Sequence, residues 1–179
     1  MFIHCIFLGF KKEYKGKGYG SQLLELCEKD AKQEGMAGIA VVTRKGSFMA
    51  GNELFLEHDY LIVDFAPPDF DLLAKKFATK SPDPKFMEGL EDRAERYSSG
   101  LTIIRADQCP YTVKNVSEIR ALAEGEFGIK PKIIDLKNHQ EAQAAPGPFG
   151  TFCILYNGEI VAHHPVSSGR FRNIIKKLM

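Results

Sequence analysis

Three alternating glycines, Gly16, Gly18 and Gly20, constrain the fold of this chain more than any other feature. They follow residues 2–10, an apolar segment rich in Ile and Phe that predicts a buried strand. They precede residues 21–34, where apolar side chains recur at helical spacing. Glycine allows a positive φ and a close approach to the main chain, and a helix start presents unpaired N–H groups. The sequence therefore predicts an anion cradle made of backbone.

Two common nucleotide-binding motifs do not fit this loop. A dinucleotide-binding fold uses G-x-G-x-x-G, whereas the spacing here is G-x-G-x-G. A P-loop requires G-K-[ST], which does not follow. Four lysines, Lys11, Lys12, Lys15 and Lys17, surround the glycines with positive charge. The alternative interpretation is a glycine-rich turn that binds no ligand.

The segment YKGKGYGSQLL resembles motif A of the GNAT acetyltransferases, written Q/R-x-x-G-x-G/A. It matches at Lys15, Gly18 and Gly20, with Lys15 in place of the usual Gln or Arg. The resemblance implies that backbone amides across residues 15–21 bind the pyrophosphate of acetyl-CoA and that the preceding strand runs along its pantetheine arm. The coenzyme-binding residues so implied are Ile6, Phe7, Leu8, Gly9, Lys15, Gly16, Lys17, Gly18, Tyr19, Gly20 and Ser21.

The sequence departs from the GNAT family in two ways. ELFLEHDYLIVDF resembles motif B, and aligning Tyr60 with its strand aromatic places Phe55 where the family often has a Tyr that protonates the departing thiolate. A phenyl ring has no proton to give. A full family member also has roughly 70 residues before this point, which form the first strands and line the acceptor site, so we expect a partial domain.

Acetyl transfer in this family is direct attack of an amine on a thioester, which needs a base and a polarised carbonyl. Glu13 or Glu57 is a candidate base, with a solvated surface charge as the alternative for each. The resemblance implies that a backbone N–H near Gly9 or Phe10 polarises the carbonyl if the strand splays. No catalytic residue is assigned beyond these candidates and Cys109.

The rest of the first half continues with alternating elements. Residues 38–43 predict a strand parallel to the first, 52–58 a short helix, 60–65 a strand and 70–77 an amphipathic helix. We therefore expect a GNAT-like acetyl-CoA-binding domain over residues 1–80. Residues 81–99, with two prolines and a charged run, predict a linker.

Residues 100–179 predict a second domain. The expected order is strand, helix, strand, short helix, two strands and helix, with Asn157-Gly158 as a hairpin turn. This order resembles the thioredoxin and glutaredoxin fold. The expected segments are residues 101–107, 112–124, 130–137, 138–145, 151–156, 159–164 and 169–179.

Cys109 stands where thioredoxin-like proteins begin their C-x-x-C motif. A cysteine at a helix start gains thiolate character, but Thr112 replaces the second cysteine, so dithiol exchange within this motif is excluded. A structural or binding module with an unreactive Cys109 and a monothiol oxidoreductase both stay open, whereas Cys153, in an apolar strand, is expected in the core. A GNAT half followed by such a module resembles the YoaP-like acetyltransferases.

Composition excludes several classes of protein. The 24 basic and 23 acidic residues leave no excess of positive charge of the kind that nucleic-acid-binding proteins have. No apolar run is long enough to span a membrane, and no Cys/His spacing indicates a metal. We expect a cytoplasmic α/β (α+β) protein that acetylates an unidentified amine; the alternative is a non-catalytic binding or thiol redox-sensing protein. We also expect another strand, such as one from a second copy, to cover the edge at residues 2–10.

Overall fold

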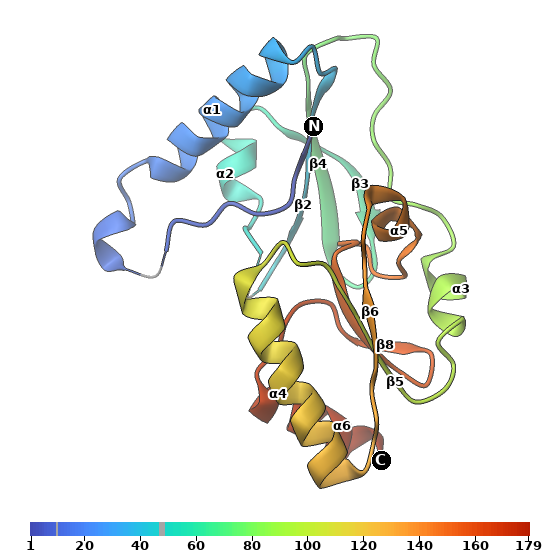
Figure 1. The fold of residues 1–179 in the computed structure, drawn as a ribbon. Coiled ribbons are helices and arrows are strands. Elements are labelled where there is room, and N and C mark those ends of the chain that lie inside the picture. The colour runs from blue at the N-terminus through green and yellow to red at the C-terminus, as the bar shows by residue number, and fades with distance from the viewer. Residues whose placement is uncertain (10, 47–48) are drawn as a thin grey trace. The chain divides into compact units, whose positions relative to one another are not determined.

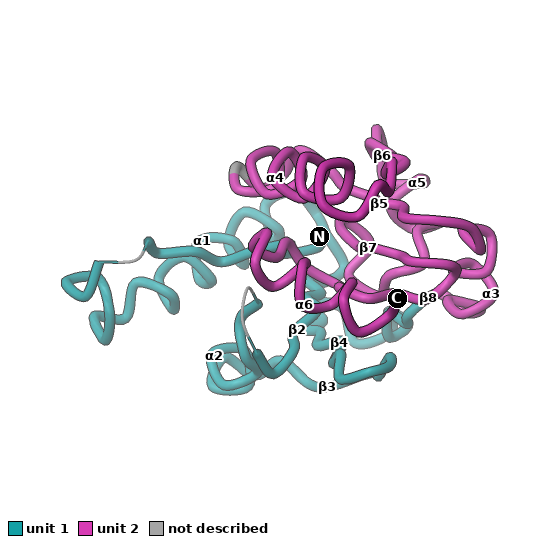
Figure 2. The backbone as a smooth tube through the Cα atoms, turned by 90° about the horizontal axis from the view of Figure 1, so that it is seen from below, with its two compact units in different colours: residues 1–86 teal, residues 87–179 magenta. Residues whose placement is uncertain are grey.

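The computed structural model describes residues 1–9, 11–46 and 49–179. The chain divides into two compact units, residues 1–86 and 87–179 (Figure 2). Each unit contains a mixed sheet with helices, which confirms the predicted α/β class. The division lies inside the range 81–99 expected as a linker, and part of that range folds as a helix, α3 (Leu90–Glu95).

The first unit is built on a four-stranded sheet in the order β1-β2-β4-β3 (Figure 1). β1 and β2 are parallel, and β4 pairs antiparallel with both β2 and β3. The strands are β1 (Phe2–Ile3), β2 (Gly38–Arg44), β3 (Leu61–Ala66) and β4 (Phe70–Lys76). The helices are the short 3-10 turn η1 (Lys12–Tyr14), α1 (Tyr19–Gln33) and α2 (Glu53–Leu56). The expected parallel pair and both α-helices are confirmed.

The helix predicted over residues 70–77 is wrong, because this segment is the strand β4. β4 lies between β2 and β3 and is buried on both faces, so Leu72 and Leu73 are both nearly inaccessible. A strand buried on both faces loses the alternation of apolar and polar residues that normally identifies it. A short apolar run of this kind cannot be told from a helix by periodicity alone.

The strand expected over residues 2–10 is also shorter than predicted. Only Phe2 and Ile3 pair with β2, opposite Ala40 and Val41. Residues 4–9 leave the sheet, and Phe10 lies outside the described residues. The apolar composition of this segment predicted that it is buried. Strand pairing also requires a neighbouring strand that runs alongside the segment, and composition gives no information about such a neighbour.

The helices of the first unit cover one face of its sheet. Leu24 and Ala31 of α1 and Phe55 of α2 pack with Val41 and Leu73 of the two central strands. This places the apolar face of α1 on the sheet and leaves its first turn at the end of the glycine loop.

The second unit has a sheet in the order β6-β5-β7-β8. β5 is parallel to β6 and antiparallel to β7, which pairs antiparallel with β8. Asn157 and Gly158 both have positive φ, as the predicted hairpin turn requires. The strands are β5 (Leu101–Arg105), β6 (Lys132–Asp135), β7 (Phe152–Tyr156) and β8 (Glu159–Ala162), and the remaining helices are α4 (Pro110–Phe127), α5 (His139–Ala144) and α6 (Ser168–Leu178). The seven elements predicted from the sequence are therefore confirmed.

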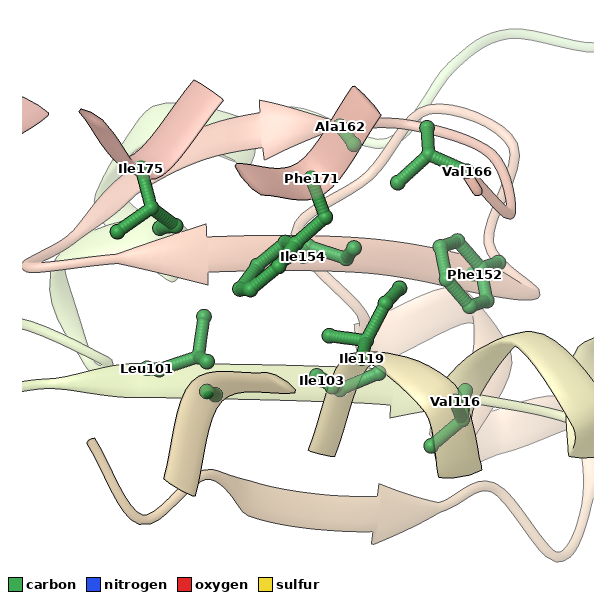
Figure 3. Packing of buried hydrophobic residues seen from close by; sticks show 11 residues of the cluster. Leu101, Ile103, Val116, Ile119, Phe152, Ile154, Ala162, Val166, Phe171 and Ile175 are labelled. Atoms are coloured by element: carbon green, nitrogen blue, oxygen red, sulfur yellow. The ribbon is translucent and has the colours of Figure 1, made fainter. Parts of the chain in front are cut away.

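Side chains that alternate along β5 and β7 form two cores. Ile103 and Ile154 face α4 and α6, where Ile119 and Phe171 pack on them (Figure 3). On the other face, Cys153 packs with residues of α3 and with Ala145, which follows α5. The second unit is thus a sheet between two helical layers. No helix in the described part of the chain is long and apolar enough to cross a membrane.

Candidate functional site

The glycine loop changes direction at two left-handed residues before it enters α1. Gly16 has φ 69° and Gly18 has φ 73°. Gly18 is the residue that caps the helix, and α1 begins at Tyr19. The predicted loop–helix junction is therefore present, and the helix starts two residues earlier than the spacing indicated.

The start of α1 leaves backbone donors available. The first hydrogen bond of the helix runs from Gln22 N to Gly18 O at 3.0 Å, so the amides of Tyr19, Gly20 and Ser21 precede it. Gly18 has no side chain with which to cap them. A Cβ placed on Gly16 or Gly18 would meet no atom within 4 Å, so this side of the loop is open to a ligand. The helix dipole adds partial positive charge at the same point.

The lysines around the loop are exposed. Lys11 pairs with Glu13 at 3.4 Å, and both side chains are mostly accessible to solvent. Lys12, Lys15 and Lys17 form no ion pair with any carboxylate among the described residues. Their charge is therefore available to an anion at the start of α1.

The first two strands of the chain separate after Ile3. β1 pairs with β2 up to Ile3 and Val41, whereas β2 continues beyond that point and pairs with β4 as far as Arg44 opposite Phe70. In the described residues, the other edge of β2 from residue 42 to residue 44 carries no strand. Figure 1 shows the segment after β1 running away from β2. The arrangement leaves this edge of β2 without a neighbouring strand among the described residues.

Leu54 of α2 lies close to Gly20 at the start of α1. A Cβ on Gly20 would lie 3.5 Å from Leu54 Cδ2 and 3.9 Å from Leu8 Cδ1. An added Cβ on Gly20 would therefore make only ordinary van der Waals contacts, whereas Gly16 and Gly18 have the positive φ that favours glycine. Leu8 and Gly20 belong to the residues predicted to bind the coenzyme, and both Leu54 and Leu8 approach Gly20. Ile6 packs on the core, while Phe7 is exposed.

The two aromatic residues of the second motif are in the core. Phe55 and Tyr60 are each 1% exposed, and their rings meet edge to face with centroids 5.6 Å apart. Burial, reinforced by the nearby Glu28 carboxylate, raises the pKa of Tyr60. The core position of Phe55 explains why an apolar ring is accommodated there. Glu57, at the end of α2, is exposed.

A buried ion pair fixes α1 on the sheet, and the sequence analysis did not find it. Lys75 of β4 donates to Glu28 of α1 at 2.8 Å, and Glu28 is 7% exposed. Removing one partner would leave an uncompensated buried charge. The available signal was a glutamate on the apolar face of an amphipathic helix, one turn after Leu24.

A second polar cluster was also missed. Thr43, which is fully buried, stands opposite Asp71 in the β2–β4 ladder, and the side chain of Asn52 joins them. The sequence signal was a Thr and an Asp inside otherwise apolar strands. Recognising the cluster required the pairing of β2 with β4.

In the second unit, Cys109 caps α4 with its backbone. Its carbonyl accepts a hydrogen bond from Thr112 N at 3.0 Å, and the thiol is partly exposed. Thr112 is buried. Cys153 is 1% exposed, as predicted, and burial raises its pKa to about 12. The described residues contain no group of three His, Cys, Asp or Glu side chains arranged to hold a metal.

Comparison with known proteins agrees with this arrangement. Residues 2–54 match the acetyltransferase (GNAT) family, and residues 132–173 match the YoaP-like family. The chain is 28% identical over 180 residues to a Bacillus subtilis (strain 168) protein named as an uncharacterized N-acetyltransferase, YoaP, an alignment that covers 99% of this chain and 70% of that protein. No solved structure matches. The chain is thus similar to GNAT acetyltransferases over residues 2–54, to YoaP-like proteins over residues 132–173, and along nearly its whole length to the N-acetyltransferase YoaP.

Proposed function

We propose that this protein is an N-acetyltransferase that binds acetyl-CoA and transfers the acetyl group to an amine. The observation that carries the proposal is the pairing of an open anion cradle at the start of α1 with the divergence of β1 from β2. The GNAT match covers both features, because it runs from residue 2 to residue 54.

In this proposal the pyrophosphate lies on the backbone amides at the start of α1, with Lys15 and Lys17 adding charge. Anions bind at helix starts because unpaired N–H groups and the helix dipole point at them. The pantetheine arm runs along residues 6–9, where the unpaired edge of β2 leaves room for its amides to form strand-like hydrogen bonds. The proposed set is Ile6, Phe7, Leu8, Gly9, Lys15, Gly16, Lys17, Gly18, Tyr19, Gly20 and Ser21.

The chemistry requires an amine nitrogen to attack the thioester carbonyl. A carbon–nitrogen bond forms, the carbon–sulfur bond breaks, and the coenzyme leaves as a thiolate that takes up a proton. A backbone N–H near Gly9 is the proposed donor to the developing oxyanion; Phe10, the other position considered, lies outside the described residues. Phe55 supplies no proton, so solvent or the acceptor amine protonates the thiolate. Glu13 and Glu57 are the proposed candidates for the base.

For the second unit we propose a thioredoxin-like module, residues 100–179, that recognises the acceptor or a partner protein. The strand order β6-β5-β7-β8, with one parallel and two antiparallel pairs, supports this. The comparisons favour acetyl transfer over a thiol redox-sensing role, because the GNAT match and the homologue both concern acetyltransferases. We expect the protein to act in the cytoplasm, where Cys109 stays reduced.

Isothermal titration with acetyl-CoA and with CoA is the direct test of coenzyme binding. We expect binding of both, and binding by neither at millimolar concentration would refute the proposal. Replacing Lys15 and Lys17 together by Ala should weaken CoA binding about tenfold, and the effect should shrink as salt rises. Lys29→Ala removes an exposed charge farther along α1 and is the matched control.

Acetyl transfer is then measured with a mixed panel of amines, and the acetylated product is detected by mass spectrometry. Turnover of any amine above the hydrolysis rate of acetyl-CoA supports the proposal. Tight CoA binding without transfer to any amine would instead support the non-catalytic alternative.

A further inference from the structure

A hydrogen-bonded group of three side chains lies where β2 continues beyond its pairing with β1. Thr43 and Asp71 face each other across the β2–β4 ladder, and Asn52 stands immediately before α2. Thr43 Oγ1 donates to Asn52 Oδ1, and Asn52 Nδ2 donates to Asp71 Oδ2 at 2.6 Å. Thr43 is completely buried, so its hydroxyl depends on this partner.

The chemistry of the three groups fixes their orientation. A carboxylate only accepts hydrogen bonds, so the amide nitrogen of Asn52 faces Asp71. The amide oxygen of Asn52 then faces Thr43, whose hydroxyl donates. Turning the carboxamide over would set its oxygen against the Asp71 carboxylate and lose that bond, so Asp71 determines the orientation of Asn52.

Asn52 in turn holds the start of α2. Its backbone carbonyl accepts hydrogen bonds from Phe55 N at 3.0 Å and Leu56 N at 2.9 Å. Leu54, on this single turn of helix, lies against Gly20 at the start of α1, a glycine that Leu8 also approaches. The helix has only four residues and little stability of its own. Its position therefore depends on contacts such as those of Asn52.

We propose that Thr43 and Asp71 are positioning residues for the coenzyme site, acting through Asn52 and Leu54. The inference rests on the proposed function, because Leu8 and Gly20 belong to the proposed acetyl-CoA site. The hydrogen bonds set the position of α2 relative to the sheet. Leu54 then keeps the start of α1 and the segment around Leu8 at the separation that accepts the coenzyme.

The test compares Thr43→Val with Thr43→Ser in the full-length chain. Valine keeps the shape of threonine but leaves Asn52 Oδ1 without its donor, whereas serine keeps the hydroxyl. CoA affinity is measured by isothermal titration and thermal stability by calorimetry. We expect Thr43→Val to weaken CoA binding about tenfold, because one hydrogen bond that positions Asn52 is lost. The CoA affinity of Thr43→Ser should stay within threefold of that of the wild type.

Ile39→Val is the matched control, since Ile39 is equally buried on the same strand but precedes the point of divergence. It should lower thermal stability and leave CoA affinity unchanged. If Thr43→Val binds CoA as tightly as the wild type, the inference is overturned. It is also overturned if Ile39→Val, at the same thermal stability as Thr43→Val, loses as much CoA affinity as Thr43→Val does. Asp71→Ala provides a second variant if Thr43→Val does not fold, with the same tenfold expectation. Absence of CoA binding by the wild type would refute the proposed function instead.

Discussion

Gly18 provides a test that separates backbone conformation from ligand approach. Its φ of 73° lies in the left-handed region, and a Cβ there would meet no atom within 4 Å. Replacement by Ala therefore causes no clash. It places a side chain in a left-handed conformation, which lowers the free energy of unfolding by roughly 1–2 kcal/mol for L-residues. Ala also restricts the unfolded chain, which offsets this loss by about 0.4–1 kcal/mol. The net loss is about 0–1.6 kcal/mol, or a fall in Tm of at most about 13 °C for a unit of this size.

Gly18→Asn is the informative partner of Gly18→Ala. Asparagine tolerates the left-handed region and is a favourable helix cap, so its stability should be close to that of the wild type. It nevertheless fills the space above the loop that the pyrophosphate is proposed to occupy. We expect both variants to lose at least tenfold in CoA affinity, which corresponds to about 1.4 kcal/mol.

The assay is isothermal titration at fixed ionic strength with CoA and with pantetheine, which lacks the pyrophosphate. Pantetheine affinity should stay within twofold in both variants, because the residues along its arm are unchanged. A Gly18→Asn variant that binds CoA as well as the wild type would show that the glycine serves only the turn. The anion-cradle interpretation would then be wrong.

Three further predictions concern packing, thiol chemistry and capping. Gly38→Ala should destabilise the first unit by about 1–3 kcal/mol in denaturant unfolding, because the new Cβ would lie 2.6 Å from the backbone oxygen of Lys75; a change below 0.5 kcal/mol would contradict the tight β2–β4 spacing. Cys153, with its pKa raised to about 12, should resist alkylation by iodoacetamide at pH 8 while the exposed Cys5 reacts, and mass spectrometry distinguishes the two sites. Because the pKa of Cys153 is higher in the folded than in the unfolded chain, the stabilisation from its buried neutral thiol should persist at neutral pH. That stabilisation should decline above the unfolded pKa near 9. Ser167→Ala removes the side-chain cap of α6 and should cost about 1 kcal/mol, whereas unaltered unfolding of the second unit would refute that role.

Several features followed from the sequence because their causes are local. The positive φ of Gly16 and Gly18 and the start of α1 depend on residues within one turn of each other. The Asn157-Gly158 hairpin likewise depends on two neighbouring residues that accept a left-handed conformation. Cys153 could be placed in the core because it stands in an unbroken apolar strand.

Other features depend on which strand lies beside which. Residues 70–77 form a central strand rather than a helix because β2 and β3 flank them and bury both of their faces. The pairing of Thr43 with Asp71, and of Glu28 with Lys75, arises between segments that are far apart in sequence. No pattern within a short stretch of sequence predicts which of these distant segments pair.

The sequence by itself determined the left-handed glycines and the helix that follows them, since both depend on residues close together in the chain. Only the tertiary structure decided that β1 leaves β2 after two residues, so that the edge of β2 beyond Val41 has no neighbouring strand among the described residues. It also decided that Phe55 turns into the core rather than toward the site. The physical reason is the same in each case: burial and pairing depend on the surfaces that the rest of the chain brings into contact.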